Sequence, residues 1–201
     1  MTLGDTPRIK ICVSGAADTS HCGEEAFDVA YSLGKEIARQ NCVLVEGATT
    51  GFPYFAARGA KEAGGVVVGF SPARTEREHV EYYGLPLDYK DLIVYTGFGY
   101  SGRNLILTRA SDAVISGCGR IGTINEFTIA FEDGKPLGIL EGAWDTDELI
   151  KSIIEKSHRA DEMRDKIVFE SDPKAMVEKL IKLVEIEKKL DGAIDKKPRR
   201  D

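Results

Sequence analysis

The sequence predicts a three-layer α/β sandwich, in which helices cover both faces of one doubly wound parallel sheet. Short runs that are apolar throughout alternate along the chain with longer segments in which apolar residues recur at helical spacing. Strands without polar alternation are buried on both faces, as in a parallel sheet held between two helical layers. At 201 residues the chain is long enough to form one such domain with a sizeable core.

Seven apolar runs are expected to be the strands, and right-handed crossovers between them give a Rossmann-like topology. They are residues 9–13, 42–45, 66–68, 92–95, 113–115, 137–140 and 167–169. Helices are expected over 24–40, 52–63 and about 102–110, after the loop 117–123, and from Asp145 and Asp172 onward.

The last two helices carry their own start signals. Asp145 and Glu148 are expected to form a capping box, and Asp172 to be an N-cap that is followed by a proline. The stretch between residues 68 and 92 is expected to be a long connection.

Composition limits the classes of partner. A formal charge of −6 argues against a nucleic-acid-binding face, which would need to be basic. No apolar segment resembles a signal sequence or reaches membrane-spanning length, so we expect a cytoplasmic protein without a membrane partner. The domain is expected to occupy residues 1–190, and the charged tail 191–201 to be disordered.

The four cysteines have neither the density nor the spacing of a disulfide framework. Cys12 and Cys42 fall in expected strands and are interpreted as small buried hydrophobic residues. His21-Cys22 has no second pair at metal-ligand spacing, so we expect no metal site. No histidine or lysine adjoins Cys118 in the sequence, which favours packing over a nucleophilic role.

In a doubly wound sheet, ligands bind outside the carboxyl ends of the strands, where the helices begin. The function is therefore expected in the loops 14–23, 46–51, 96–102 and 116–123. The first loop lacks G-x-G-x-x-G, and Thr123 stands where a Walker A loop has lysine, so hydride transfer and P-loop ATP hydrolysis are not supported.

What remains is two glycine-bearing turns with threonine hydroxyls at one edge of the sheet. Each glycine could serve only its tight turn, but the pair favours a phosphate or nucleotide site. The residues expected to contact phosphate or nucleotide are Ser14, Gly15, Gly47, Thr49, Thr50, Gly51, Gly119, Arg120, Ile121, Gly122 and Thr123.

Arg103 and Glu126 lie at this same edge of the predicted sheet. Arg103 is expected to open the helix after the fourth strand, and Glu126 lies about one turn into the helix after the fifth. A cation at a helix N-terminus opposes the helix dipole, and a carboxylate beside a phosphate site repels the ligand. The two side chains either form an ion pair or face a ligand. Phe98 and Tyr100 either stack on a base or anchor their loop.

These residues carry a family resemblance. Arg103-Asn104, Ser111-Asp112-Ala113 and Gly119-x-x-Gly122-Thr123-x-x-Glu126 resemble the signature of the LOG (Lonely guy) family. Those proteins are phosphoribohydrolases that act on cytokinin nucleoside monophosphates, and they were long mislabelled lysine decarboxylases. The similarity spans roughly residues 9–140 and includes the glycine-rich segment 47–52. It implies a Rossmann-like fold, a homodimer and a nucleotide site at the carboxyl edge of the strands.

The resemblance implies that Arg103 and Glu126 are the catalytic pair, and that Gly119, Gly122 and Thr123 belong to the phosphate-binding loop.

The chain departs from the family pattern at several positions. Cys118 stands at the family's proline, Arg120 at its second glycine and Asn104 at its lysine, while Ala48 and Thr49 replace two glycines. Arg120 could add a phosphate ligand or block the site. This variant pattern is more similar to a sister branch that includes molybdenum cofactor carrier proteins and DprA/Smf-related proteins.

Two functions follow from these observations. The first is hydrolysis of the N-glycosidic bond of a nucleoside 5′-monophosphate to a free base and ribose 5-phosphate. Glu126 would act near the anomeric carbon while Arg103 holds the base or ribose. The alternative is a nucleotide sensor or a molybdenum-cofactor (pterin) carrier that binds without cleaving. We expect no cofactor in the reaction and no nucleic-acid partner.

Overall fold

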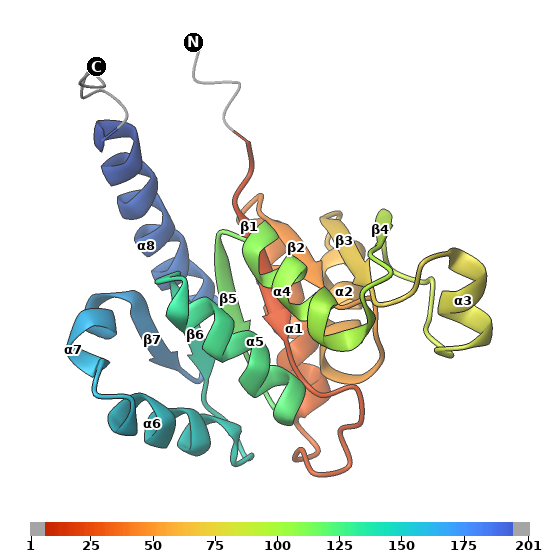
Figure 1. Ribbon diagram of the computed structural model, residues 1–201, viewed down its shortest axis with the longest axis horizontal. Helices are drawn as coiled ribbons and strands as arrows, with labels where there is room; N and C mark the ends of the chain where they lie inside the picture. The colour runs from red at the N-terminus through yellow and green to blue at the C-terminus, as the bar shows by residue number, and fades with distance from the viewer. Residues whose placement is uncertain (1–6, 195–201) are drawn as a thin grey trace.

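The computed structural model describes residues 7–194 and confirms the predicted α/β class, with helices on both faces of a single sheet (Figure 1). Seven parallel strands are ordered β4-β3-β2-β1-β5-β6-β7. They are β1 (Lys10–Ser14), β2 (Val43–Glu46), β3 (Val66–Ser71), β4 (Leu92–Tyr95), β5 (Ala113–Ser116), β6 (Leu137–Leu140) and β7 (Ile167–Glu170). Each apolar run that the sequence singles out falls mostly within one strand, although β3 continues beyond its run as far as Ser71.

Most of the helices form two layers that cover opposite faces of the sheet, and the short α3 lies beyond the edge strand β4 (Figure 1). They are α1 (Ala26–Arg39), α2 (Gly51–Glu62), α3 (Glu76–Glu81), α4 (Gly99–Ala110), α5 (Ile121–Glu132), α6 (Thr146–Lys156), α7 (Ala160–Met163) and α8 (Pro173–Ile194), with a 3-10 turn at Arg164–Lys166. Ile11 and Val13 of β1 pack in a core with α1, α2 and α8. Cys12 points the other way, into a core with α4, α5 and α6, because successive strand residues face opposite sides.

The topology reverses at β1. The chain moves outward through β2, β3 and β4, and then returns to place β5 against the other side of β1. The loops after β1 and β5 therefore lie side by side, and Ala16 N–H donates to the Cys118 carbonyl across 2.8 Å. Such a switch point leaves a crevice at the carboxyl ends of the strands.

Three helices differ from the sequence expectation, and one of them, the four-residue α7, lies between α6 and β7, where no helix was expected. The stretch between β3 and β4 contains α3, a single short helix whose Thr75 hydroxyl accepts from the Glu78 N–H at 3.2 Å. Helix α4 begins at Gly99 rather than near residue 102, because Gly97 and Gly99 both have positive φ and turn the chain tightly after β4. Arg103 consequently lies one turn inside α4 and does not open it.

The two expected helix starts have different outcomes. Asp172 caps α8 as predicted, since its Oδ2 accepts from the Ala175 N–H at 2.8 Å. The capping box at Asp145 is wrong: Asp145 has helical backbone angles, and its side chain makes no capping bond. An N-cap side chain reaches the first turn from an extended backbone, which Asp145 lacks.

The expectation that the cysteines form no disulfide, and that Cys118 only packs, is wrong. Cys22 and Cys118 form a disulfide although 96 positions separate them in the sequence. Cys12 and Cys42 are free and buried, as predicted.

Within residues 7–194, no helix is both long and apolar enough to cross a membrane. Helix α8 runs to Ile194, and residues 195–201 of the expected tail lie outside the described part of the chain.

Candidate functional site

A crevice of about 400 Å³ lies at the switch point, between the loops that follow β1 and β5. It is lined by Gly15, Ala16, Ala17, Asp18, Thr49, Tyr100, Arg103, Asn104, Arg120, Ile121, Gly122, Thr123 and Glu126. Hollows of similar size lie along α3 and between α1 and α8, but mostly exposed side chains line them. Only the switch-point crevice, among these hollows, brings buried polar side chains together.

The N-terminus of α5 forms one wall of the crevice. Among the described residues, the backbone N–H groups of Ile121, Gly122 and Thr123 have no protein acceptor, because the first bond to this turn is donated by Ile124. The first turn of α5 has no acidic residue, and a Cβ built on Gly122 would meet nothing within 4 Å. Unpaired N–H groups at the positive end of a helix dipole bind anions.

Glu126 projects from the second turn of α5 toward the end of β1. Its side chain is buried, with 7% exposure, and Oε2 accepts a hydrogen bond from the Ser14 hydroxyl. Burial raises the pKa of Glu126 and the nearby Glu46 carboxyl adds to the shift, while Arg103 and the Ser14 hydrogen bond oppose it. Glu126 therefore lines the crevice and can donate or accept a proton. Its carboxyl is fixed in place by the hydrogen bond from Ser14.

Arg103 is equally buried, at 6% exposure, and its guanidinium reaches across the ends of two strands. Nη1 donates to the carbonyl oxygen of Gly47 after β2 and to that of Phe70 in β3, the latter at 3.3 Å. Its Nε has no partner among the described residues, and the guanidinium lies 5.8 Å from the ring centre of Tyr100. The Nε donor of Arg103 is thus left without a protein partner in the described structure.

Arg103 and Glu126 meet at one crevice, as the sequence analysis requires, yet no ion pair joins them within residues 7–194. A second buried carboxyl lies behind them: Glu46, whose Oε1 is 3.8 Å from the Lys90 ammonium. Burial raises the pKa of Glu46, and Lys90 opposes that shift. The guanidinium of Arg103 therefore lies in the field of two buried acids.

Several of the predicted phosphate-contacting residues support the crevice from behind. A Cβ on Gly47 would overlap the Arg103 guanidinium, so glycine leaves room for that side chain. The Thr50 hydroxyl donates to the Ala17 carbonyl at 3.2 Å, and Gly51, with φ of +69°, packs against Ala16 and Ala17. Thr50 and Gly51 support the β1 loop, Gly47 makes room for Arg103, and none of the three lines the crevice.

Gly119 does not line the crevice either, because its backbone is paired with Thr146. Its N–H donates to the Thr146 hydroxyl at 2.8 Å, and that hydroxyl donates back to the Gly119 carbonyl at 3.0 Å. Ile121, Gly122 and Thr123, by contrast, line the crevice.

Arg120 lies at the mouth of the crevice. Its guanidinium forms a 2.8 Å ion pair with Asp18 of the β1 loop, and its Nε donates to the His21 ring at 3.3 Å. Both partners are exposed, so the arrangement is weakly held. Arg120 can turn toward an anion at the α5 N-terminus without leaving a buried charge unpaired.

Sequence reasoning missed part of the lining. Ala16, Ala17 and Asp18 belong to the expected loop 14–23 but were not singled out within it, and Asn104 appeared only as a departure from the family pattern. The Asn104 amide donates to Asn125 at 3.0 Å, while its Oδ1 has no partner in the described structure. Asp18 could have been recognised as a lining residue from the expected position of its loop beside the loop after β5.

The fold and the crevice define a Rossmann-like protein with an open crevice at its topological switch point. The chain belongs to the SLOG cluster4 family, whose model matches residues 8–177. The predicted resemblance to this LOG-like superfamily is thereby confirmed. An uncharacterized protein of Archaeoglobus fulgidus is 35% identical over 133 residues, which cover 66% of this chain and 82% of that protein.

Two solved structures are similar over nearly the whole chain. The molybdenum cofactor binding protein of Rippkaea orientalis is 27% identical with a TM-score of 0.67, and the match covers 90% of this chain and 97% of that one. The molybdenum cofactor carrier protein of Chlamydomonas reinhardtii is 26% identical with a TM-score of 0.67, over 88% of this chain and 99% of that one. These likenesses favour the carrier alternative of the sequence analysis over the hydrolase.

Proposed function

We propose that this protein binds a phosphorylated heterocyclic small molecule in the switch-point crevice and holds it without cleaving it. The candidate ligands are a nucleoside 5′-monophosphate and the phosphorylated pterin of the molybdenum cofactor. The observation that carries the proposal is that the N–H groups of Ile121, Gly122 and Thr123 have no protein acceptor in the described structure. These residues line the crevice beside an exposed cation, Arg120.

The remaining lining suits the rest of such a ligand. Tyr100 is half exposed and offers a ring face for a base or pterin. The free Nε of Arg103 and the free Oδ1 of Asn104 offer one donor and one acceptor that would otherwise stay unsatisfied. A crevice of about 400 Å³ falls within the usual range for small-molecule sites.

Binding without turnover is supported by the bonds of the two residues that a hydrolase would use. The Glu126 carboxylate is held by Ser14, and Nη1 of Arg103 is held by two strand-end carbonyls. These bonds would have to rearrange before either group acted on a glycosidic bond. Similarity to proteins described as molybdenum cofactor carriers supports the same choice.

A pair of substitutions at Gly122 tests the proposal. Gly122→Glu and Gly122→Gln both fit the open space at this position, but only glutamate places a negative charge at the anion site. AMP and isolated molybdenum cofactor are each titrated while thermal unfolding is followed. Saturation to about one hundred times Kd should stabilise wild type by about 2.7 kcal/mol.

The Gln variant should retain most of this ligand stabilisation, and the Glu variant should lose it. The free Glu variant should be at least as stable as wild type, because an acidic residue suits a helix N-terminus and replaces a helical glycine. Equal ligand stabilisation of the two variants, or no stabilisation of wild type by either ligand, would overturn the proposal.

One observation favours a second function, N-glycosidic hydrolysis of a nucleoside monophosphate. Burial raises the pKa of Glu126, as suits a carboxyl that exchanges a proton with a ligand or water. Incubation with AMP, followed by chromatography for free adenine, tests this function. Release that Glu126→Gln abolishes would establish it, and base levels equal to those without protein would exclude it for AMP.

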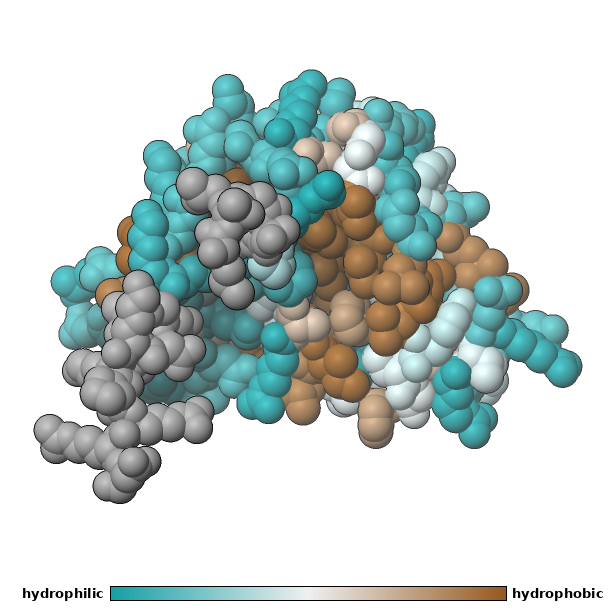
Figure 2. Space-filling model, turned by 90° about the horizontal axis from the view of Figure 1, so that it is seen from above, coloured by the Kyte–Doolittle hydropathy of each residue, from teal (hydrophilic) through white to brown (hydrophobic). Residues whose placement is uncertain are grey.

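We also propose that the protein is a homodimer, as the family resemblance implies. Figure 2 shows a continuous apolar area on the half of the molecule where Figure 1 places β3, β4 and α4. Leu92 of the edge strand β4 is 57% exposed, Phe98 before α4 is 69% exposed, and Leu105 of α4 is 39% exposed. Contiguous apolar surface next to an open sheet edge is typical of a subunit interface.

A further inference from the structure

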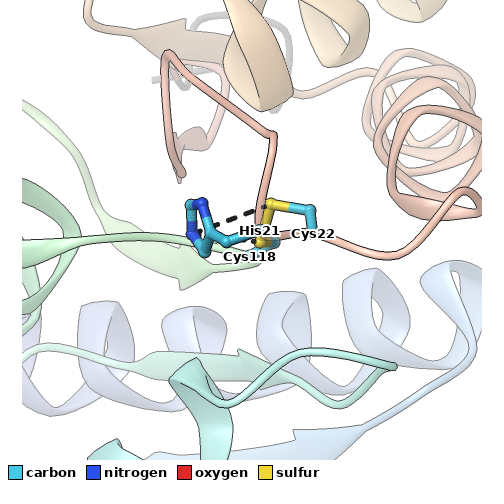
Figure 3. A group of neighbouring side chains, drawn as sticks. All are labelled: His21, Cys22 and Cys118. Atoms are coloured by element: carbon cyan, nitrogen blue, oxygen red, sulfur yellow. Dashed lines mark hydrogen bonds between the residues drawn. A yellow bond between two sulfur atoms is a disulfide. The ribbon is translucent and has the colours of Figure 1, made fainter.

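A cluster of three metal-ligating side chains lies beside the crevice, outside the proposed ligand site. His21 and Cys22 belong to the loop after β1, and Cys118 to the loop after β5 (Figure 3). The His21 Nε2 atom lies 3.7 Å from the Cys118 sulfur and 3.9 Å from the Cys22 sulfur. One imidazole nitrogen thus approaches both sulfurs of the disulfide.

We propose that His21, Cys22 and Cys118 form a reduction-gated site for a thiophilic divalent cation of the zinc class. When the two cysteines are joined, the sulfurs have no charge to offer and the site is closed. When they are reduced, the same three side chains present two thiolates and one imidazole. This proposal does not depend on the proposed binding of a phosphorylated ligand.

The donor set fits zinc. Two sulfurs and one ring nitrogen are a common ligand set for zinc, and three protein ligands leave a fourth position open. With bonds of about 2.3 Å to sulfur and about 2.0 Å to nitrogen, a tetrahedral ion separates these donors by about 3.5 Å. The observed nitrogen-to-sulfur distances therefore require only small movements, while the sulfurs must separate by side-chain rotation.

The surroundings permit this movement. Cys118 is fully buried, Cys22 is partly exposed and His21 is exposed, so one side of the site faces solvent. The Cα atoms of the two cysteines are 5.9 Å apart, which lets both side chains reach one ion after the sulfur bond is broken. A disulfide that served only as a staple would not need an imidazole against both of its sulfurs.

Opening the metal site requires a two-electron reductant for the disulfide. A small dithiol transfers two electrons to the Cys22–Cys118 disulfide, becomes a disulfide itself and leaves two protein thiols. The cation then replaces one proton on each thiol, so two protons are released for each ion bound. Imidazole contributes its neutral lone pair.

Metal binding would also change the contact between His21 and Arg120, a residue that lines the crevice. His21 Nδ1 accepts from Arg120, so the ring proton resides on Nε2, which lies 3.2 Å from the Gly119 carbonyl. Coordination through Nε2 moves that proton to Nδ1 and removes the acceptor of Arg120. Metal binding would therefore remove one contact that holds Arg120 at the crevice mouth and leave its ion pair with Asp18.

Cobalt(II) titration of the full chain tests the proposal, because thiolate coordination produces charge-transfer absorption. Protein reduced with a phosphine and freed of reductant under argon should bind one cobalt per chain with this signature. Zinc should displace it, and air-oxidised protein should show none. Proton release during titration should be close to two per ion.

Matched variants locate the site. Cys22→Ser and Cys118→Ser should each abolish the thiolate signature of a two-sulfur site, and His21→Ala should weaken cobalt binding at least tenfold. Cys42→Ser and His158→Asn change a cysteine and a histidine elsewhere and should bind as wild type does. Circular dichroism verifies that each variant is folded.

Absence of charge-transfer absorption in folded, reduced wild type would overturn the proposal. So would binding that survives Cys22→Ser or that is equal in the oxidised protein.

Discussion

Glu126 shows how this site sets the protonation of a buried acid. Burial disfavours the charged carboxylate, while Arg103 and the Ser14 hydroxyl favour it, and burial is the larger influence. The resulting pKa lies above the ordinary range of a glutamate. Ionisation of such a buried carboxyl destabilises the fold. The free energy of unfolding therefore depends on pH.

Glu126→Gln should reveal that dependence. A carboxyl with a raised folded-state pKa stabilises the fold below its unfolded pKa of about 4.3, and this contribution is lost as the pH rises through the folded value. The amide keeps an acceptor for Ser14 but does not ionise. The free energy of unfolding of the variant relative to wild type should therefore increase from acid to neutral pH, as measured by urea denaturation.

Glu155→Gln, which alters an exposed carboxylate of α6, is the matched control and should show no such trend. A stability difference between wild type and Glu126→Gln that stays constant with pH would contradict the assigned pKa shift.

Arg103→Ala is predicted to destabilise the fold even without ligand. The substitution removes the buried donor that the carbonyls of Gly47 and Phe70 share. The expected loss is about 2–4 kcal/mol in the free energy of unfolding. Arg77→Ala, at a side chain that is 83% exposed, should change urea stability little. Equal effects of the two substitutions would show that Arg103 has no structural role.

The sequence placed these residues at one edge but could not assign their partners. Arg103 and Glu126 belong to a recognisable motif, and their helices start at the same end of the sheet. The carbonyls that hold Arg103 come from β2 and β3, and a backbone oxygen has no residue-type signal. For the same reason the sequence did not indicate that Gly47 leaves room for the Arg103 guanidinium, or that Thr50 and Gly51 contact the loop after β1.

At the scale of elements, the strands and helices that could be predicted from the sequence are those that bury apolar residues. The seven strands were recognised because strands covered on both faces are apolar throughout, and only a parallel sheet makes such runs. Helix α3 was missed because its six residues, Glu76–Glu81, are nearly all polar and have no apolar stripe. The early start of α4 depends on two positive-φ glycines, whose backbone angles the sequence does not report.

The disulfide links the two loops that enclose the crevice, and its pairing could not be derived from spacing. Breaking a link between residues 96 positions apart increases the entropy of the unfolded chain. Reduction should lower the free energy of unfolding by about 2–5 kcal/mol, measured by urea denaturation with and without a phosphine reductant. Cys22→Ser should be insensitive to reductant. Identical midpoints for wild type in both conditions would exclude a stabilising bridge.

At the scale of the whole molecule, the apolar surface over β4 and α4 predicts a dimer. Leu105→Glu should dissociate it, because the charge would be buried at the interface. Leu149→Glu changes a leucine of α6 that is 51% exposed and should leave the assembly intact. Sedimentation equilibrium measures both. A monomeric wild type at micromolar concentration, or dissociation by both substitutions, would contradict this interface.

The central claim is that the N-terminus of α5 holds the phosphate of an intact ligand at the switch point of the sheet. The most direct measurement is a crystal structure of the protein grown with AMP. We predict uncleaved AMP in the crevice, with its phosphate accepting hydrogen bonds from the N–H groups of Ile121, Gly122 and Thr123. A phosphate bound elsewhere, or a crevice that contains no nucleotide at saturating AMP, would contradict the account for this ligand.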